Sequence, residues 1–371
     1  MIVKPKIMTL FGTRPEAIKM CPLVIKLCEK PFFEHKLCIS GQHKEMLDDV
    51  LEEFSVTPNY DLEIMKDCRA TSDTMLKTAE RLTPILEFER PDILLVHGDT
   101  STALGGALAA FYLGIPVGHV EAGLRSFDIS SPFPEEFNRI TIDKISQLCF
   151  APTRQAEKNL LAEGKQRTDI FVVGNTVIDS LIMSIKRDYR NPLLKALLPN
   201  EKSRFFLLTL HRRENIGEPM RNMLRAIRRA VEERENISLL FPVHKNPAVR
   251  EIVEEILCGA PRIFMTEPMS STDFRNMLAR CDAVLSDSGG IQEEAAFLGK
   301  PMLLLRDTTE RPEASGNILL TGRSEEGVYK CFTSLLDNQR LAEKMSRPSS
   351  AFGDGNASEK IISVLYKYFF D

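Results

Sequence analysis

Short runs of apolar residues alternate with amphipathic stretches along the whole chain of 371 residues. The runs that we expect to form buried strands are 7–11, 37–40, 93–97, 117–120, 170–173, 205–210, 239–242, 262–265, 283–286 and 302–305. Between them, apolar residues recur at helical spacing in stretches such as 16–29, 72–88, 220–235 and 292–298. Strand–helix alternation of this kind predicts parallel sheets that are covered by helices on both faces.

The alternation is interrupted once, in the middle of the chain. Residues 188–204 contain Asn191-Pro192 and Pro199-Asn200 among several lysines and arginines, with little apolar signal for a strand. A chain of this length usually forms two domains. We therefore predict an α/β fold with two Rossmann-like, doubly wound domains, residues 1–174 and 175–354. A C-terminal helix over about 355–371 is expected to pack back on the first domain.

The charge balance and the cysteines narrow the class of protein. Lys and Arg number 48 and Asp and Glu number 52, and the net charge of −4 argues against a broad nucleic-acid-binding or membrane-surface role. No uninterrupted apolar run reaches the ~18 residues that would indicate a membrane span. The eight cysteines are scattered without a C-x-x-C pair, which predicts reduced thiols and a cytoplasmic protein.

Polar residues follow directly after most of the expected strands. Ligands bind at the carboxyl ends of the strands in a parallel sheet, so these residues are the candidates for a functional site. If two such domains face each other, the polar strand ends would meet at one cleft between them. They include Gly12-Thr13-Arg14-Pro15-Glu16, Gly98-Asp99, Glu121, His211-Arg212-Arg213, His244, Asp287-Ser288-Gly289-Gly290 and Arg306-Asp307-Thr308-Thr309-Glu310-Arg311.

Two of these segments have the chemistry of phosphate-binding sites. Ser288 and Gly290 precede an expected helix, where free backbone N–H groups favour an anion, although a tight strand–helix turn would have the same sequence. Arg14 and Lys19 could clamp a phosphate or remain solvated on their helix. The first turn is not G-x-G-x-x-G, so the dinucleotide-binding fingerprint is absent.

Three carboxylates are candidate acid–base groups. Asp99 and Glu121 end neighbouring expected strands, and Glu135 follows a proline-bounded loop. Each could instead cap a helix or complement its dipole. His97 and His119 stand two residues before the first two carboxylates, which raises a metal site as an alternative. No H-E-x-x-H motif or Cys–His cluster supports that alternative, and we predict no metal.

The motifs at the strand ends occur together and in order over nearly the whole chain. They are Gly12-Thr13-Arg14-Pro15-Glu16-Ala17-Ile18-Lys19-Met20, Val96-His97-Gly98-Asp99-Thr100, Gly118-His119-Val120-Glu121-Ala122-Gly123-Leu124-Arg125, Pro132-Phe133-Pro134-Glu135-Glu136, Gly174-Asn175-Thr176, His211-Arg212-Arg213-Glu214, Asp287-Ser288-Gly289-Gly290-Ile291-Gln292-Glu293-Glu294 and Arg306-Asp307-Thr308-Thr309-Glu310-Arg311-Pro312-Glu313. In this combination the sequence resembles the non-hydrolysing bacterial UDP-N-acetylglucosamine 2-epimerases.

The resemblance implies a glycosyltransferase-B-like architecture and the interconversion of UDP-GlcNAc and UDP-ManNAc for cell-surface polysaccharide synthesis. In that family, carbon 2 loses its proton and UDP leaves by anti elimination, which forms 2-acetamidoglucal. UDP adds back after carbon 2 is reprotonated from the other face. The resemblance further implies a homodimer, UDP-GlcNAc and UDP as ligands, and no cofactor.

Position by position, the resemblance assigns catalysis to Asp99, Glu121, Glu135 and His211. The carboxylates would transfer protons, and His211 would steady the diphosphate or the leaving oxygen. Contacts with the UDP-sugar are assigned to Arg14, Lys19, His244, Met269, Phe274, Ser288, Gly290, Glu294 and Arg311. In members that bind a second, activating UDP-GlcNAc, the corresponding positions are Gln42, His43, Arg69 and Arg213. The sequence departs from those members at Lys44 and Cys68, where they carry arginine.

Other functions stay open on the sequence alone. A hydrolysing 2-epimerase, or an epimerase of a modified UDP-sugar, would share these motifs. A glycosyltransferase of the same architecture would need an acceptor in addition. A non-catalytic UDP-sugar-binding protein would keep the binding residues without turnover.

Overall fold

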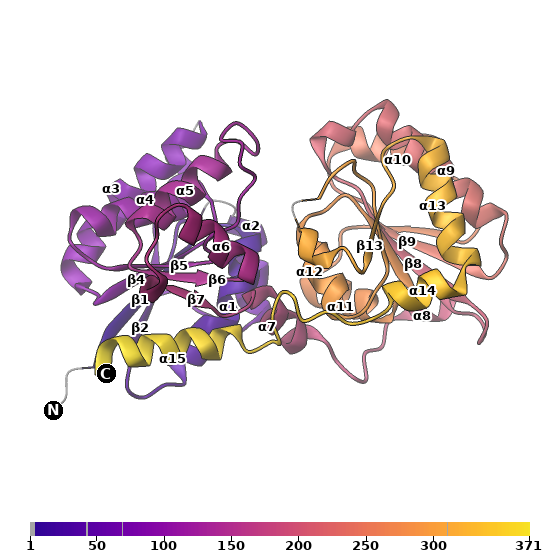
Figure 1. Cartoon of the computed structure of the whole chain (residues 1–371). Helices are drawn as coiled ribbons and strands as arrows, with labels where there is room; N and C mark the ends of the chain where they lie inside the picture. Colours follow the sequence, from indigo (N-terminus) through magenta and orange to yellow (C-terminus); the bar gives the residue numbers. More distant parts are fainter. Residues whose placement is uncertain (1–3, 42–43, 69, 310) are drawn as a thin grey trace. The chain divides into compact units, whose positions relative to one another are not determined.

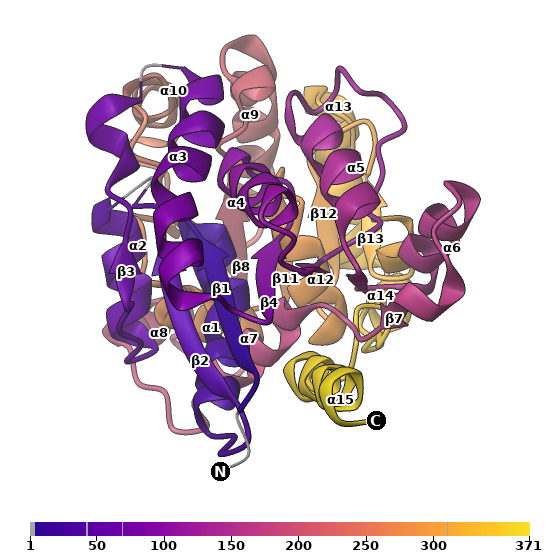
Figure 2. The same cartoon turned by 90° about the vertical axis from the view of Figure 1, so that its left-hand side faces the viewer.

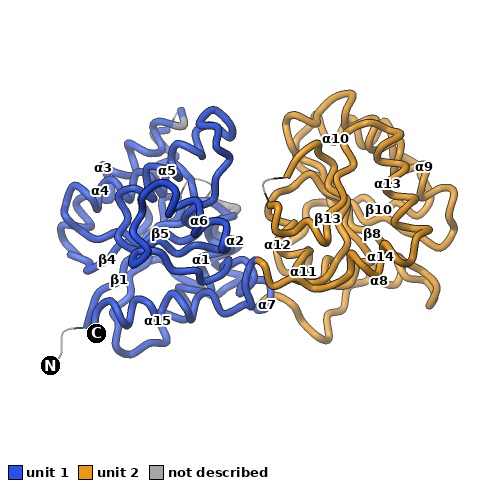
Figure 3. Tube along the Cα trace, in the orientation of Figure 1, with its two compact units in different colours: residues 1–183, 352–371 blue, residues 184–351 orange. Residues whose placement is uncertain are grey.

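The structure is a computed structural model that describes residues 4–41, 44–68, 70–309 and 311–371. The chain divides into two compact units, residues 1–183 with 352–371 (unit 1) and residues 184–351 (unit 2) (Figures 1 and 3). Each unit contains one parallel sheet with helices packed on both faces. The prediction of an α/β fold with two doubly wound domains is therefore confirmed.

The divisions between the units fall after residue 183 and after residue 351, whereas the sequence placed them after residues 174 and 354. The reason is a contact between helix α7 (Thr176–Ser184) and the start of helix α15 (Ala357–Phe370). The carboxylate of Asp179 in α7 accepts hydrogen bonds from the backbone N–H groups of Ala357 (3.1 Å) and Ser358 (2.8 Å). Helix α15 then packs against α1 (Arg14–Cys28), so both α7 and α15 belong to unit 1.

Within the described residues, the sheet of unit 1 has seven strands in the order β3-β2-β1-β4-β5-β6-β7, and all neighbouring pairs are parallel. The order of strands along the chain reverses between β1 and β4, which makes the carboxyl ends of these two strands the usual place for a ligand. The strands are β1 (Lys6–Phe11), β2 (Glu34–Ile39), β3 (Tyr60–Asp61), β4 (Ile93–His97), β5 (Val117–Val120), β6 (Leu148–Ala151) and β7 (Ile170–Val172).

Alternate side chains of these strands face the two helical layers. In β1, Ile7 and Phe11 join the core under α1, α2 and α15, whereas Met8 and Leu10 join the core under α3, α4 and α5. This period of two is what a strand buried on both faces requires. Helices α3 and α4 lie side by side (Figure 2). The remaining helices of unit 1 are α2 (Lys44–Glu53), α3 (Thr71–Glu89), α4 (Ser101–Tyr112), α5 (Glu135–Ile145) and α6 (Arg154–Ala162).

Unit 2 repeats this arrangement with a smaller sheet. Its strands run in the order β10-β9-β8-β11-β12-β13, and the chain order reverses between β8 and β11. The strands are β8 (Arg204–Thr209), β9 (Ile237–Pro242), β10 (Ile263–Thr266), β11 (Ala283–Ser286), β12 (Met302–Leu304) and β13 (Ile318–Leu320). Its helices are α8 (Pro192–Leu197), α9 (Glu218–Glu232), α10 (Pro247–Leu257), α11 (Ser271–Arg280), α12 (Gly290–Phe297), α13 (Glu325–Asp337) and α14 (Gln339–Met345).

Three strands were not predicted from the sequence. They are β3, β6 and β13, which have two, four and three residues. Such short segments show no measurable alternation, and only their pairing with longer neighbours makes them strands. In the part of the chain that the structure describes, short 3₁₀ helices also connect elements, at Ile64–Asp67, Arg167–Asp169, Arg213–Asn215 and Pro312–Ala314. None of the helices formed by the described residues is long and apolar enough to cross a lipid bilayer.

Two histidines of unit 1 give a prediction for acid stability. Burial lowers the pKa of His35 to about 4 and that of His97 to about 3, from an ordinary value of 6.5. The unfolded chain takes up these protons below pH 6.5 and the folded chain does not, so the stability present above pH 6.5 is lost as the pH falls toward 4. We expect His35→Gln to flatten this decline in melting temperature, measured by circular dichroism from pH 7 to pH 4. A variant whose decline parallels the wild type would contradict the expectation.

Candidate active site

Glu16 ties together the turns that follow β1 and β4. Its Oε2 accepts the backbone N–H groups of Gly12 (3.1 Å) and Thr13 (2.8 Å), and its Oε1 accepts the hydroxyl of Thr100 (2.7 Å). Thr13 caps α1 in return, which completes a capping box. Burial raises the pKa of Glu16. The two turns at the strand-order reversal are therefore held in a fixed relation, and Arg14 and Lys19 follow on the helix that starts there.

The turn after β1 leaves no room for a side chain at Gly12. A Cβ there would lie 1.9 Å from Oγ of Ser40 and 2.7 Å from Oγ1 of Thr102, which are themselves 2.9 Å apart. We expect Gly12→Ala to destabilise the protein by about 1–3 kcal/mol through overpacking. Urea unfolding measures this change. Gly316→Ala is the matched control, because no atom lies within 4 Å of its added Cβ, and a similar loss in both variants would contradict the packing argument.

Glu121 follows β5 in the left-handed backbone region, with φ of 69°. Its Oε2 is paired with Nζ of Lys19 and accepts Nδ2 of Asn175 at 2.8 Å. Nε2 of His97 lies 3.8 Å from the same oxygen. The structure thus brings together Lys19 and Glu121, two predicted site residues that are far apart in the sequence, and adds Asn175.

Asp99 lies at the end of β4 and is held by helix α5. Its carboxylate is paired with the guanidinium of Arg139, and its backbone carbonyl accepts Nδ2 of Asn138 at 2.8 Å. The N-cap of α4 is Thr100, so Asp99 does not serve as that cap. Since Gly98 would place a Cβ 3.9 Å from Oε1 of Glu121, the turn that carries Asp99 lies beside Glu121.

Glu135 is the first residue of α5 and is half-buried, one helical turn before Arg139. Its neighbour Glu136 is fully buried and has a structural role. Glu136 accepts the backbone N–H groups of Ser126 (3.0 Å) and Phe127 (3.1 Å) and pairs with Arg139 at 2.7 Å. It thereby closes the loop between β5 and α5.

The two strand histidines differ in their contacts. Both ring nitrogens of His119 are bonded, Nδ1 to Asp143 at 2.6 Å and Nε2 to the carbonyl of Gly98 at 2.7 Å. Both ring nitrogens of His97 are buried without a hydrogen-bond partner. Among the described residues, no group of three or more His, Cys, Asp or Glu side chains is arranged to hold a metal ion.

In unit 2, Asp287 organises the turn after β8. Its buried carboxylate accepts the backbone N–H groups of His211 (3.2 Å) and Arg212 (3.0 Å) and Nδ2 of Asn215 (2.9 Å). The imidazole of His211 stacks on that of His244, with ring centroids 5.9 Å apart. Burial, together with His211, lowers the pKa of His244. His211 and His244 are therefore brought together as predicted site residues of this unit.

The start of α12 has the features of an anion site. The helix has Gly289 as N-cap and no side-chain cap, so Ser288 does not cap it. A Cβ on Gly290 would meet no atom within 4 Å, and one on Gly289 would lie 3.8 Å from Nη2 of Arg212. The start of α12 therefore borders open space beside a guanidinium, and the first N–H groups of a helix favour an anion.

The remaining predicted contacts of unit 2 lie around the same helix. Glu294 is paired with Nε of Arg275 at 2.8 Å, and Arg311 is paired with Glu293 at 2.5 Å. Both glutamates are buried. Met269 and Phe274 are partly buried against the core beneath α11. These ion pairs hold Glu294 and Arg311 in place.

Sequence reasoning missed Arg139 and Arg275, for which the sequence carries no signal. Asp287 was among the candidate residues that follow a strand directly, but it had no assigned role. Of the residues predicted to bind an activating nucleotide, Arg213 begins a 3₁₀ helix and is exposed. Gln42, His43 and Arg69 lie outside the described residues, so that site stays a prediction.

Comparison with known proteins agrees with the motifs. The family model described as UDP-N-acetylglucosamine 2-epimerase matches residues 25–366. The UDP-N-acetylglucosamine 2-epimerase of Bacillus subtilis is 47% identical over 98% of this chain and 95% of its own length. The crystal structure of UDP-GlcNAc 2-epimerase from Neisseria meningitidis bound to UDP-GlcNAc has a TM-score of 0.90 and 42% identity, covering 98% of this chain and 100% of that one.

A second solved structure, S. aureus MnaA with UDP, has a TM-score of 0.91 and 45% identity over 98% of this chain and 97% of that one. The match therefore extends over both units and is not confined to a shared nucleotide-binding domain. On this evidence, the chain belongs to the UDP-N-acetylglucosamine 2-epimerase family.

Proposed function

We propose that this chain interconverts UDP-GlcNAc and UDP-ManNAc by inverting carbon 2. The observation that carries the proposal is the pair of carboxylates, Asp99 and Glu121, at the ends of adjacent parallel strands, each paired with a cation. Inversion requires a proton to leave one face of carbon 2 and another to arrive on the opposite face. These two carboxylates are the groups that we propose for the two proton transfers.

The reaction that we propose begins with elimination. A carboxylate removes the proton from carbon 2, the bond between carbon 1 and the diphosphate oxygen breaks on the opposite side, and UDP leaves with the electron pair. The product is 2-acetamidoglucal. Protonation of carbon 2 from the other face and attack of UDP on carbon 1 then complete the epimerisation. Glu135, at the start of α5, is the third candidate acid–base group.

The diphosphate of the leaving UDP is assigned to unit 2. His211, Ser288 and Gly290 would meet it together with the N–H groups of α12, where positive partial charge stabilises a departing anion. In addition, Arg14, Lys19, His244 and Arg311 are proposed to contact the UDP-sugar, Glu294 the ribose hydroxyls, Phe274 the uracil ring, and Met269 the uracil edge through its backbone.

The experiment is proton NMR of purified protein with UDP-GlcNAc in deuterated water. We expect UDP-ManNAc to form, with deuterium at carbon 2 of both epimers. Free ManNAc in place of UDP-ManNAc would replace the proposal with a hydrolysing enzyme. UDP binding without turnover or exchange would replace it with a non-catalytic binding protein.

We further propose that the enzyme acts in the cytoplasm and supplies UDP-ManNAc for cell-surface polysaccharides. The cysteines agree with a reducing compartment, because all eight lie within the described residues and none is in a disulfide. The measurement is the epimerase activity of each fraction of the source cells. Activity in the periplasmic or secreted fraction as high as in the cytoplasmic fraction would contradict this location.

The protein is also proposed to be a homodimer. Phe88 at the end of α3 and Tyr112 at the end of α4 are 81% and 83% exposed, and Phe111 and Leu113 beside Tyr112 are also exposed. An apolar surface of this kind is typical of an interface. We expect Phe88→Glu and Tyr112→Glu to shift the protein from dimer to monomer in light scattering coupled to gel filtration. Tyr368→Glu on α15 is the control, and an unchanged dimer in the first two variants would exclude this surface.

A further inference from the structure

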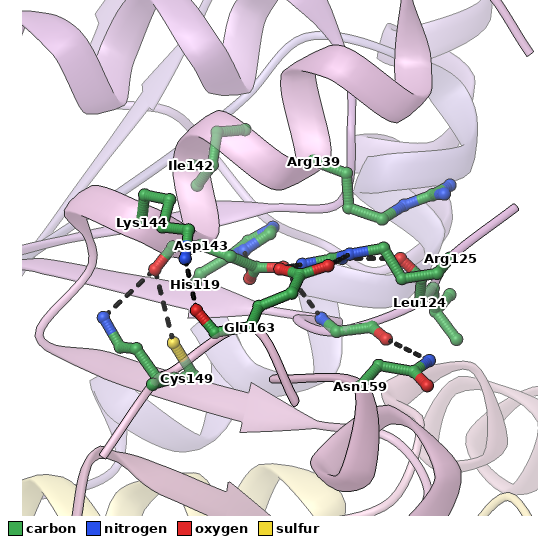
Figure 4. Close-up of polar contacts among 12 residues, drawn as sticks. His119, Leu124, Arg125, Arg139, Ile142, Asp143, Lys144, Cys149, Asn159 and Glu163 are labelled. Atoms are coloured by element: carbon green, nitrogen blue, oxygen red, sulfur yellow. Dashed lines mark hydrogen bonds and ion pairs between the residues drawn. The ribbon is translucent and has the colours of Figure 1, made fainter. Parts of the chain in front are cut away.

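A cluster of four charged side chains in unit 1 comes from β5, the loop after β5, α5 and the turn after α6 (Figure 4). Asp143 of α5 is 2.6 Å from Nδ1 of His119 through Oδ1 and 2.7 Å from Nη2 of Arg125 through Oδ2. Arg125 also pairs with Glu163 at 2.6 Å. The side chains of His119, Arg125 and Asp143 are 0%, 1% and 2% exposed and are shielded from water, whereas Glu163 is 28% exposed.

The hydrogen bonds determine the charges in this cluster. The carbonyl of Gly98 can only accept, so Nε2 of His119 donates to it at 2.7 Å. Burial alone would raise the pKa of Asp143, but His119 and Arg125 hold it below its usual value, so this carboxylate is ionised. Nδ1 of His119 bonds to this carboxylate at 2.6 Å. Arg125 supplies the buried carboxylate with its counter-charge, which is the condition for burying a charge.

The same groups bond to the backbone of both turns that carry the proposed acid–base residues. His119 holds the carbonyl of Gly98, the residue before Asp99. Asp143 accepts the N–H of Gly123, two residues after Glu121, at 3.1 Å. Arg139, one helical turn before Asp143 on α5, pairs with Asp99 itself. Helix α5 thus holds the turn after β4 at two points. Asp143 acts through His119 on the backbone carbonyl of Gly98, and Arg139 pairs with the side chain of Asp99.

We propose that His119, Asp143 and Arg125 form a positioning clamp that sets the distance between Asp99 and Glu121 for proton transfer at carbon 2. This inference rests on the proposed epimerase function. None of the three side chains needs to touch the substrate. The clamp acts by preventing the two turns from moving independently. This matters for the rate, because a shift of about 1 Å at a reacting group costs roughly 10²-fold in rate.

The test compares Asp143→Asn, His119→Gln and Arg125→Lys with wild type after UDP-ManNAc formation by the wild type has been established. We expect the first two variants to lose about 10²-fold in kcat with calorimetric UDP affinity unchanged, because the groups assigned to the diphosphate lie in unit 2. Arg125→Lys keeps one ion pair and is expected to fold with an intermediate loss. Deuterium exchange at carbon 2 should fall in parallel with kcat.

Leu86→Ala is the control for simple loss of stability. Leu86 is fully buried on α3 in a core of the same unit and is not one of the clamp residues. If Leu86→Ala loses as much kcat as a clamp variant with the same fall in melting temperature, the effect is structural and the proposal is overturned. Wild-type kcat in folded Asp143→Asn and Arg125→Lys would also overturn it. An inactive wild type would instead refute the proposed function.

Discussion

Replacing Asp99 by asparagine or Glu121 by glutamine is expected to lower kcat for UDP-GlcNAc by about 10²–10⁴-fold, the usual contribution of a general acid or base. Both substitutions keep the size of the side chain and remove its ability to accept a proton at neutral pH. The partner cations, Arg139 and Lys19, would remain in place. UDP affinity should change little, since the groups assigned to the diphosphate belong to unit 2.

The measurement is proton NMR in deuterated water, started separately from UDP-GlcNAc and from UDP-ManNAc. A variant that lacks the base for one face should fail to exchange the epimer deprotonated from that face, which assigns each carboxylate to its face. Glu87→Gln, an exposed carboxylate on α3, is the matched control and should behave as wild type. Full activity and full exchange in both Asp99→Asn and Glu121→Gln would remove these residues from the mechanism.

Replacing Asp287 by alanine is expected to have the largest effect in unit 2. The change leaves the N–H groups of His211 and Arg212 and the amide of Asn215 without their acceptor inside the protein. Leaving a buried hydrogen-bond donor without an acceptor costs about 1–3 kcal/mol for each group. The turn after β8 would also move, so His211 and Arg212 would no longer face the start of α12, and UDP affinity should fall.

Asp282→Ala is the control for this prediction. Asp282 stands at the opposite end of the same strands and accepts the backbone N–H of Phe205, at 2.9 Å. We expect a smaller loss of about 1 kcal/mol in urea unfolding and no change in calorimetric UDP affinity. Equal losses of stability and affinity in both variants would show that Asp287 has no specific role at the turn.

The sequence predicted most of the longer strands and helices, but it did not predict which side chains of different elements contact one another. The local sequence indicates the start of α1, because Thr13 and Glu16 have the spacing of a capping box. It does not indicate the hydrogen bond between Glu16 and Thr100, because these residues are 84 positions apart. Such contacts depend on which strands become neighbours, and local periodicity carries no information on that order.

The two histidines show the same limit at the site itself. His97 and His119 both stand two residues before a carboxylate near the end of a buried strand, and the sequence offers no way to tell them apart. In the structure, His119 is bonded at both ring nitrogens and His97 at neither. The difference arises because α5 packs beside β5 and places Asp143 against His119.

The sequence by itself determined that the chain forms parallel sheets, that their strands end in polar residues and that these residues match one enzyme family. Local hydrophobic periodicity and motif spacing carry this information. Only the tertiary structure decided that Glu121 pairs with Lys19, that Asp99 pairs with Arg139 and that His119 joins the two turns. The choice of partner depends on strand order and on burial, because a charged group enclosed by the fold must find its counter-charge among whichever side chains the packing brings near.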